Sequence, residues 1–257
     1  MPDFELIAST LRGGLAIDEI RFEVEGAAPA SGYLLGRRNE GPQPVVLAVH
    51  HERGDKATLL PDLENLAGRG FLCLSIDSPV TRRASAARDP LAAFTSQFAI
   101  ARAGLSILQE IDDAIAQRTS LLGRGIGGEV AAHLAAHTGR AQVVVAVDAL
   151  PDRSAFVEHS SHALAAGMRL FHDAAEVAHQ VDELRPRRLL GQLEQAPGTH
   201  WLLQVAADDD RFSEQDRSAM SLSIPRTVRV EHIALGHDLW TVKARRARVE
   251  FISKLCG

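Results

Sequence analysis

Residues 44–50 read Pro-Val-Val-Leu-Ala-Val-His, which is a β-branched and nearly continuous apolar run. Such a run is typical of a strand that is buried on both faces of a parallel sheet. Parallel strands need a crossover connection, which is usually a helix. The run therefore predicts a central strand with helices packed on both sides of its sheet, and it places the chain in the α/β class.

Strand-like and helix-like segments alternate along the rest of the chain. Two short strands, at 20–24 and 32–35, precede the central run. The later segments are predicted as helices at 58–69, 94–117, 126–137, near Glu214 and at 239–255, and as strands at 71–77, 120–123, 142–148, 201–206 and 227–232. This rhythm predicts a doubly wound, mostly parallel sheet of about eight strands.

The stretch 151–197 interrupts this alternation. It is rich in Ala, Leu, His and Arg, lacks a strand pattern, and is too long for an ordinary connection. Because it lies between two predicted strands, we expect it at the carboxyl edge of the sheet, where open α/β folds bind ligands. We interpret it as a helical cap insertion over a pocket, within a single domain that spans 1–257.

Charge and cysteine content exclude several classes of function. The formal net charge is -5 and no basic stripe is present, so we expect no nucleic-acid partner. The sequence has neither a membrane-length apolar window nor a signal-peptide pattern, and we expect a cytoplasmic protein without a membrane partner. The two cysteines, Cys73 and Cys256, provide no disulfide framework and no paired metal-ligand spacing.

A glycine-rich turn follows the strand predicted at 120–123. The segment 121–128 reads LLGRGIGG and passes directly into the helix predicted at 126–137. A strand, a glycine turn and a helix N-terminus can bind an anion, and the glycines match Gly-x-Gly-x-x-Gly formally. Dinucleotide folds place that motif in the first βα turn, whereas here it follows about the fifth strand. We therefore rank a phosphate loop below a catalytic turn.

Four segments of the chain occur in an informative order. They are VVLAVHHERGDK with LAGRGFLCLSIDSP, then LLGRGIGG, then LLQVAADDDRF, and finally the Gly-His turn at 236–237. Together they resemble the α/β-hydrolase family, particularly its dienelactone-hydrolase-like and acyl-peptidase-like branches. In that family the four segments bring the oxyanion loop, the nucleophile elbow, the triad acid and the triad histidine. The resemblance spans nearly the whole chain and implies the α/β-hydrolase fold.

The resemblance implies that Gly125 stands where the nucleophile of the elbow should be. The family motif Gly-x-Ser-x-Gly presents a serine hydroxyl on a sharp, strained turn between a strand and a helix. Gly123 and Gly127 fit the flanking small positions, but Gly125 has no side chain. No acyl-enzyme can form at this residue.

The resemblance also implies a pair formed by a histidine and a carboxylate. His237 lies on the loop before the terminal helix and is the best placed of the eleven histidines. Asp208, Asp209 and Asp210 compete for the acid, and aligning Ala206 with the usual glycine of the family favours Asp209. A carboxylate there would fix the tautomer of the imidazole and stabilise its protonated form.

The oxyanion loop departs from the family pattern as well. His50 and His51 stand where the family has His-Gly, and we expect His50 to support the loop rather than to react. The implied oxyanion donors are the backbone N–H groups of Glu52 and Ile126. The Glu52 carboxylate would oppose a developing negative charge unless it points away or is protonated; alternatively, it is itself an acid or a base. This departure argues against ordinary ester hydrolysis.

Three interpretations of Gly125 follow. In the favoured one, His237 oriented by Asp209 moves protons on a substrate or a water molecule above Gly125, as a lyase, cyclase, isomerase or direct-water hydrolase would. In the second, the protein is a catalytically silent ligand-binding member of the fold. In the third, the sequence is a substituted variant of a serine esterase. We expect a small, largely apolar, carbonyl-containing substrate or ligand, and we expect no metal or organic cofactor.

Further side chains are candidates for the pocket or for a metal site. The pocket candidates are His51, Glu52, Arg124, Phe156, Met168 and Phe171. Glu129, His133 and His137 recur every four residues on one helix face, a spacing that can point three ligands at one metal. That spacing differs from the one in zinc hydrolases, so we interpret the face as a polar surface. Self-association into a homodimer is left open.

Overall fold

The computed structural model describes residues 3–37, 41–51, 54–77, 90–111, 114–149, 165–166, 169–170, 173, 196, 198–206, 228–233 and 241–257. Its strands are Phe4–Arg12 (β1), Leu15–Phe22 (β2), Ala30–Gly36 (β3), Gln43–Val49 (β4), Leu72–Asp77 (β5), Ala114–Arg124 (β6), Ala141–Val147 (β7), His200–Ala206 (β8) and Arg229–Ile233 (β9). Its helices are Leu60–Ala67 (α1), Pro90–Glu110 (α3), Ile126–Thr138 (α4) and Val242–Cys256 (α10).

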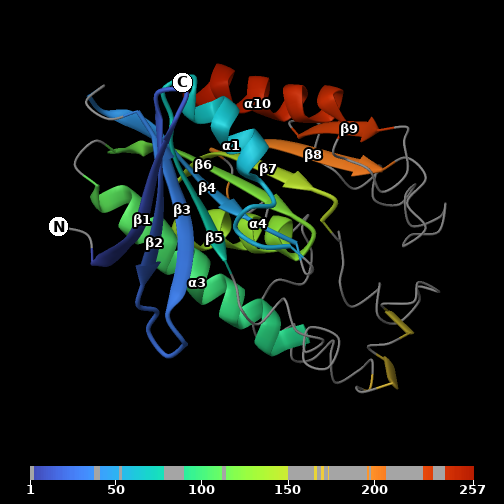
Figure 1. Cartoon of the computed structure of the whole chain (residues 1–257). Coiled ribbons are helices and arrows are strands. Elements are labelled where there is room, and N and C mark those ends of the chain that lie inside the picture. Colours follow the sequence, from blue (N-terminus) through green and yellow to red (C-terminus); the bar gives the residue numbers. More distant parts are fainter. Residues whose placement is uncertain are drawn as a thin grey trace.

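One sheet holds these strands in the order β1-β2-β3-β5-β4-β6-β7-β8-β9 (Figure 1). Antiparallel pairs join β1 to β2, β2 to β3 and β3 to β5, and every neighbouring pair from β5 to β9 is parallel. The predicted doubly wound, mostly parallel sheet is therefore confirmed. Within the described ranges the sheet has nine strands, where the sequence predicted about eight.

The additional strand is β1, which the sequence pattern did not predict. Eight of its nine residues are exposed, so neither face of the strand is buried in the core. The segment Phe4–Arg12 therefore lacks the alternation of apolar and polar residues that marks a half-buried strand. Its partner β2 does bury alternate residues, and the predicted strand at 20–24 was its carboxyl-terminal part.

A second difference concerns residues 114–117, which the sequence placed at the end of a long helix. Helix α3 instead ends at Glu110, and β6 begins at Ala114. The start of β6 pairs with β4, with Ala114 opposite Gln43 and Ile115 opposite Pro44. Sheet pairing thus overrides the helical propensity of the segment Ala-Ile-Ala-Gln.

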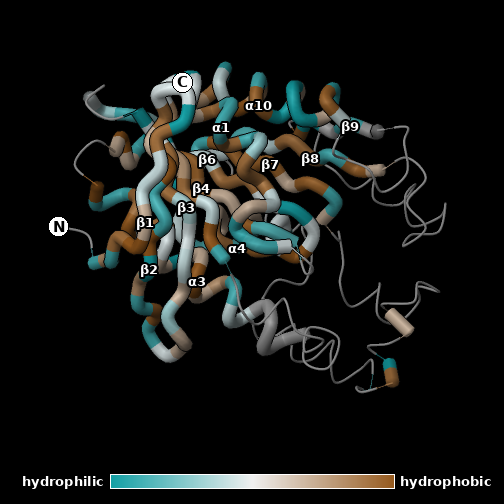
Figure 2. Tube along the Cα trace, in the orientation of Figure 1, coloured by the Kyte–Doolittle hydropathy of each residue, from teal (hydrophilic) through white to brown (hydrophobic). Residues whose placement is uncertain are grey.

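Helices cover both faces of the sheet, α3 and α4 on one and α1 and α10 on the other (Figure 1). Hydrophobic residues concentrate along the central strands between the two helix layers (Figure 2). Successive residues of β4 point to opposite layers: Val45 and Leu47 join the cluster under α3 and α4, and Val46 and Ala48 join the cluster under α1 and α10. The central run at 44–50 is thus buried on both faces, as its composition predicted.

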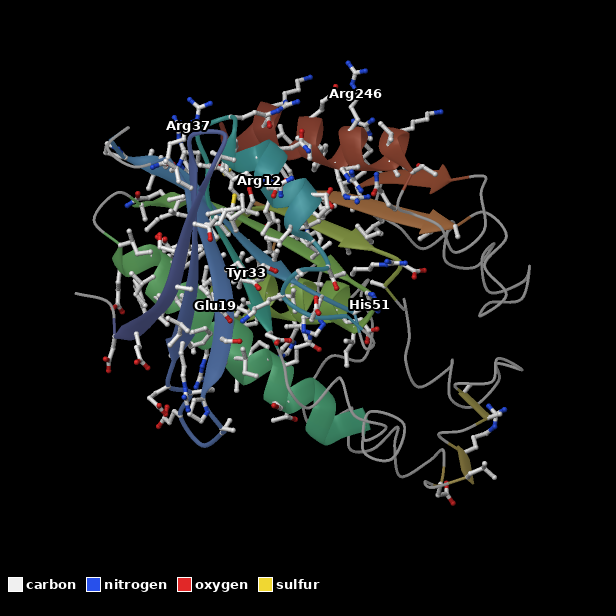
Figure 3. All side chains as sticks on the ribbon, viewed as in Figure 1. Arg12, Glu19, Tyr33, Arg37, His51 and Arg246 are labelled. Carbon is white, nitrogen blue, oxygen red and sulfur yellow. The ribbon has the colours of Figure 1, made fainter. Side chains whose placement is uncertain are left out.

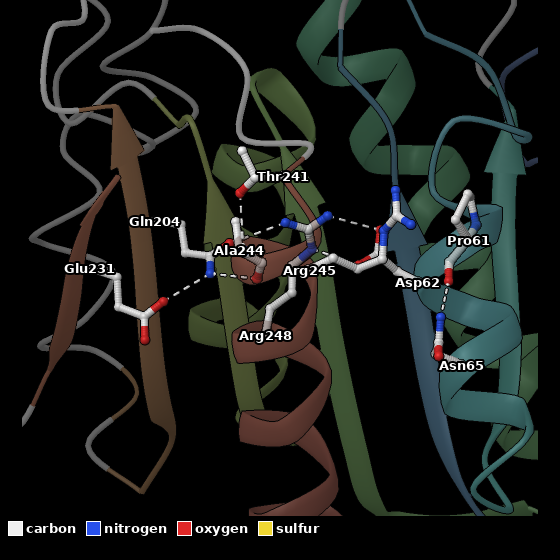
Figure 4. Close-up of polar contacts among 9 residues, drawn as sticks. All are labelled: Pro61, Asp62, Asn65, Gln204, Glu231, Thr241, Ala244, Arg245 and Arg248. Atoms are coloured by element: carbon white, nitrogen blue, oxygen red, sulfur yellow. Dashed lines mark hydrogen bonds and ion pairs between the residues drawn. The ribbon is translucent and has the colours of Figure 1, made fainter. Parts of the chain in front are cut away.

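A buried ion pair ties α1 to α10 (Figure 4). The Arg248 guanidinium donates from Nε to Oδ1 of Asp62 at 2.7 Å and from Nη2 to Oδ2 at 3.0 Å, and both side chains are buried. Arg248 also donates to Gln204 of β8 at 3.3 Å. Gln204 in turn donates to Glu231 at 3.0 Å and to the Ala244 carbonyl at 2.9 Å. The network joins two helices and two strands on one side of the sheet.

The chain reverses its direction of travel across the sheet beside β4. From β4 it passes through α1 to β5 on one side, and it then returns to β6 on the other side. The carboxyl ends of β4 and β6 therefore flank the topological switch point, where open α/β sheets bind ligands. This is the edge at which the glycine-rich turn lies.

Several predicted elements lie outside the described residues. These are most of the cap stretch 151–197, the short helix near Glu214, and the beginning of the terminal helix predicted from 239. Among the helices that the structure describes, none combines the length and hydrophobicity that a membrane span requires.

Candidate functional site

Gly125 forms the turn between β6 and α4. It is buried and has φ 54° and ψ −127°, a conformation that L-residues rarely adopt and glycine adopts at little cost. Its N–H donates to the Val147 carbonyl of β7 at 2.9 Å, and its carbonyl accepts from the N–H groups of Gly128 at 2.9 Å and Glu129 at 3.3 Å. The turn is thus held on both sides by backbone hydrogen bonds.

The glycines that flank this turn are required by close backbone contact. A Cβ on Gly123 would lie 2.0 Å from the Gly127 carbonyl oxygen. A Cβ on Gly127 would lie 2.2 Å from the carbonyl oxygen of Val49 and 2.5 Å from that of His50, at the end of β4. The first turn of α4 therefore presses directly against the carboxyl end of the central strand.

The N-terminus of α4 opens at this edge of the sheet. The first N–H groups of a helix have no partner within the helix, and the helix dipole adds partial positive charge there. Ile126 is the first residue of α4, and its side chain is buried. A negative charge that develops above Gly125 would be stabilised by this helix terminus, which is the chemistry expected of an oxyanion site.

His50 lies at the end of β4 and is completely buried. Its Nδ1 is 2.7 Å from the His51 carbonyl oxygen, so Nδ1 carries the hydrogen. Its Nε2 is 3.5 Å from Oδ1 of Asp77 at the end of β5. Gln97 of α3 donates to the His50 carbonyl at 2.9 Å. These contacts are those of a residue that supports the loop after β4.

The loop after His51 is fixed to the outer strands of the sheet. The N–H of Gly54 donates to the His51 carbonyl at 2.9 Å. Lys56 forms an ion pair with Glu19 of β2, donates to Ser31 of β3 at 3.1 Å, and lies 4.7 Å from the ring centroid of Tyr33. Glu19, Tyr33 and His51 are labelled in Figure 3. The part of this loop that the structure describes is therefore anchored at both ends.

Asp148 is a residue that the sequence analysis did not single out. It follows β7 and has φ 58°, and it is the only non-glycine residue with a positive φ within the described ranges. Its N–H donates to the Gln204 carbonyl of β8 at 2.8 Å, and Val147 before it accepts from Gly125. Strained backbone of this kind clusters at functional sites. No signal in the sequence marks the strain, because Asp148 reads as the last residue of an ordinary strand.

The strain at Asp148 predicts a difference between two substitutions. Both Asp148→Ala and Asp148→Gly remove the carboxylate, but only alanine keeps a Cβ in the left-handed conformation. We expect the alanine variant to have a free energy of unfolding about 1 kcal/mol lower than the glycine variant, as measured by urea denaturation. Equal stabilities would show that the turn after β7 relaxes without cost.

The structure brings four predicted site residues to the carboxyl edge. Arg124, Gly125 and Ile126 follow one another at the end of β6, and His51 follows the end of β4 beside it. The other predicted site residues lie outside the described residues, namely Glu52, Phe156, Met168, Phe171, Asp208, Asp209, Asp210 and His237.

The helix face with Glu129, His133 and His137 was interpreted as a polar surface, but two of its residues, His133 and His137, pack against Phe98 of α3. The His133 ring centroid lies 4.7 Å from that of Phe98 on α3, and the His133 and His137 rings stack at 6.1 Å. In the part of the chain that the structure describes, no three His, Cys, Asp or Glu side chains are arranged to hold a metal. His133 and His137 therefore contribute aromatic contacts on this face of α4.

The two thiols of the chain are not placed to act as nucleophiles at this edge of the sheet. Cys73 and Cys256 are both buried. Burial raises the pKa of each thiol, so both remain protonated near neutral pH. Neither residue follows the carboxyl end of a strand at the switch point, since Cys73 lies within β5 and Cys256 ends α10.

Comparison with known proteins identifies the fold from structure and not from sequence. No family model and no curated protein matches the sequence. The acetyl xylan esterase from Paenibacillus sp. R4 is similar with a TM-score of 0.79 at 15% identity, over 98% of this chain and 88% of that one. The acylaminoacyl peptidase from Pyrococcus horikoshii gives 0.70 at 12%, over 94% of this chain and 40% of that one.

A third solved structure covers nearly the whole of both chains. The S-formylglutathione hydrolase from Staphylococcus aureus gives a TM-score of 0.66 at 12% identity, over 93% of this chain and 99% of that one. The neighbours named here are hydrolytic enzymes by their names. Likeness at such low identity establishes the fold alone, and the chain has the α/β-hydrolase fold.

Proposed function

We propose that the protein is an α/β-hydrolase-fold enzyme without a serine nucleophile. In this proposal His237, oriented by Asp209, performs acid/base chemistry without a covalent intermediate. The observation that carries the proposal is the turn at Gly125, which combines a φ of 54° with flanking glycines that have no room for a Cβ. Such a turn has the shape that presents a nucleophile, yet its central residue has none.

Glycine at this position opens space for the reaction. A serine in the same conformation would store strain of roughly 1–3 kcal/mol and would project its hydroxyl over the sheet edge. With Gly125 a water molecule or a substrate group can occupy that place. In the proposed reaction, His237 accepts a proton from the water molecule or from the substrate and later returns it to the leaving or rearranged group. Asp209 fixes the tautomer of the imidazole.

In this proposal the helix terminus at Ile126 stabilises the negative charge that develops on the substrate. The backbone N–H groups of Ile126 and Glu52 are the proposed donors to an oxyanion or enolate oxygen. Two described contacts support a rigid frame for them: α4 presses on the end of β4, and His50 holds the loop that leads toward Glu52. Donors fixed in this way need no reorganisation during the reaction.

The substrate class follows from the proposed pocket. We propose the stretch 151–197 as a cap whose Phe156, Met168 and Phe171 line an apolar cavity over the switch point. A small, largely apolar molecule with a carbonyl group fits such a site, because the carbonyl oxygen is the group that the helix terminus can polarise. Elimination, isomerisation, cyclisation and direct attack by water on the carbonyl are the reactions open to it.

The experiment that tests this proposal follows conversion, not binding alone. The purified protein is incubated with a panel of small aryl esters, lactones and cyclic ketones, and each compound is monitored by NMR while its binding is measured by calorimetry. We expect conversion of at least one compound, with progress curves that are linear from the first turnover. Compounds that bind but stay unchanged would instead make the protein a ligand-binding member of the fold. An initial burst of one equivalent would contradict the absence of a covalent intermediate.

A further inference from the structure

Strand β1 forms an exposed edge of the sheet. It is the first strand in the sheet order, and among the strands that the structure describes only β2 pairs with it. Large hydrophobic side chains on it are open to solvent, with Leu6 55%, Ile7 51% and Leu11 74% exposed. Within the described ranges, three of the five exposed large hydrophobics lie on this one strand. The concentration of apolar surface at a strand edge calls for a partner.

The middle of β1 carries none of the usual side chains that block an edge. Natural edge strands avoid pairing through proline, inward-pointing charge or lysine, or through a bulge. Residues 6–11 read Leu-Ile-Ala-Ser-Thr-Leu, with no proline and no charge. Of these devices the strand has only a bulge, between Leu6 and Ala8, where the pairing with β2 shifts by one residue, and any pairing at this edge must accommodate it.

The bulge places the side chains of Leu6 and Leu11 on the same face of β1. Leu6 pairs with Ile20 of β2, and Leu11 pairs with Ala16. Ile20 and Ala16 are four residues apart and share one face of β2, so Leu6 and Leu11 share one face of β1. Without the bulge these leucines, five residues apart, would point to opposite faces.

The two charged residues near the ends of β1 share the opposite face of the strand. Glu5 pairs with Arg21, and Arg12 pairs with Leu15. Arg21 and Leu15 are six residues apart on β2, so Glu5 and Arg12 both point to the other face of β1. The strand therefore has a leucine near each end on one face, and opposite charges near each end on the other.

We propose that β1 pairs antiparallel with β1 of a second copy of this chain, about a two-fold axis at Ser9. In this register Leu6 lies opposite Leu11 of the partner subunit, and Glu5 lies opposite Arg12 of the partner subunit. Each contact occurs twice, as a two-fold interface requires. The edge hydrogen-bonding groups of both strands are satisfied, and the two sheets become one continuous sheet.

Arg12 can make this contact at a small cost in free energy. Its Nη1 lies 3.0 Å from Oε1 of Glu64 on α1, but the arginine side chain is exposed. Exposed ion pairs of this kind contribute little to stability, so Arg12 can exchange partners. Figure 3 shows Arg12 on the α1 side of the sheet, which is the face where Glu5 also lies. A single strand pair is a small interface, and we expect a dimer that dissociates at micromolar concentration.

Sedimentation velocity at a series of protein concentrations tests the proposal. We expect Arg12→Glu to weaken dimerisation about tenfold or more, because it places like charges opposite each other twice. The double variant Glu5→Arg/Arg12→Glu restores opposite charges and should return the dissociation constant to within about threefold of the original. Leu11→Lys should give a monomer. Two controls should leave association unchanged: Glu64→Ala removes the present partner of Arg12, and Val242→Lys adds the same charge on α10.

Disulfide cross-linking tests the position of the two-fold axis. In the proposed register Ser9 lies directly opposite Ser9 of the partner subunit, within reach of a disulfide. Ser9→Cys should therefore form a covalent dimer under mild oxidation, while Asp3→Cys, far from the axis, should not. The two native cysteines are buried and do not interfere. A monomer at all concentrations, or a dimer that tolerates Arg12→Glu and Leu11→Lys, would overturn the proposal.

Discussion

Replacing His237 with alanine is expected to reduce the rate of substrate conversion by about 10²–10⁴-fold while the protein remains folded. With Gly125 at the turn, no other group is proposed to carry the proton, so the loss should fall on the catalytic rate more than on substrate binding. The measurement is the initial rate at saturating substrate, with circular dichroism as the test of folding. Asp209→Asn should also lower the rate, because the amide fixes the wrong tautomer of the imidazole.

The matched control for this prediction is His137→Ala. His137 is an exposed histidine near the end of α4, away from the carboxyl edge of the sheet, so its removal should leave the rate unchanged. An unchanged rate in His237→Ala would rule out the proposed base. Equal losses in both histidine variants would indicate a general effect on the structure and not a role in proton transfer.

Replacing Arg248 with methionine is expected to lower the free energy of unfolding by about 3–5 kcal/mol. Asp62 is 0% exposed and Arg248 is 1% exposed, and the two form a bidentate pair between α1 and α10. Without the guanidinium the buried Asp62 carboxylate would lose both of its short hydrogen bonds and would keep only Arg245, whose Nε lies 4.0 Å from Oδ2 of Asp62. Urea denaturation measures the effect, and the midpoint should shift to a much lower concentration.

Two further variants separate this cost from a general loss of packing. Asp62→Leu combined with Arg248→Met removes both charges, and we expect this pair to be markedly more stable than Arg248→Met alone. Arg246→Met, two residues before Arg248 and on the exposed face of α10, should leave the stability nearly unchanged. If the double variant were as unstable as the single one, the buried charge of Asp62 would not be the cause.

Much of the fold could be predicted from residues that lie in an apolar environment on both faces of the sheet. Val45 to Val49 lie between helices on both faces, so their composition alone indicates a central parallel strand. The glycines at 123 and 127 could be recognised from the resemblance to the family motif, and the structure shows that neither position has room for a Cβ. Strand β1 was missed because it has no buried face, and the start of β6 was missed because pairing with β4 decides its conformation.

The site was only partly predictable, because some of its features depend on contacts between strands and not on residue type. The sequence marks Gly125 because the absence of a side chain is visible in the letters. It does not mark Asp148, which has a positive φ and donates its N–H to the Gln204 carbonyl of the next strand. The charges of Glu5 and Arg12 were visible as letters too, but their common face depends on the bulge in β1.

The proposed function requires that Gly125 stands at a nucleophile position and that His237 can activate a residue placed there. Intact-mass spectrometry after exposure to an aryl phosphonate tests it most directly, because the probe forms a stable adduct with an activated serine. The matched control is Gly139→Ser, which places serine at the other end of α4 in a similar positive φ of 61°.

We predict one phosphonate adduct on Gly125→Ser, and none on the original chain, on Gly139→Ser, or on Gly125→Ser combined with His237→Ala. An adduct on the original chain would reveal a different nucleophile. No adduct on a folded Gly125→Ser variant would show that the turn between β6 and α4 does not present an activated residue. Either result would contradict the roles proposed for Gly125 and His237.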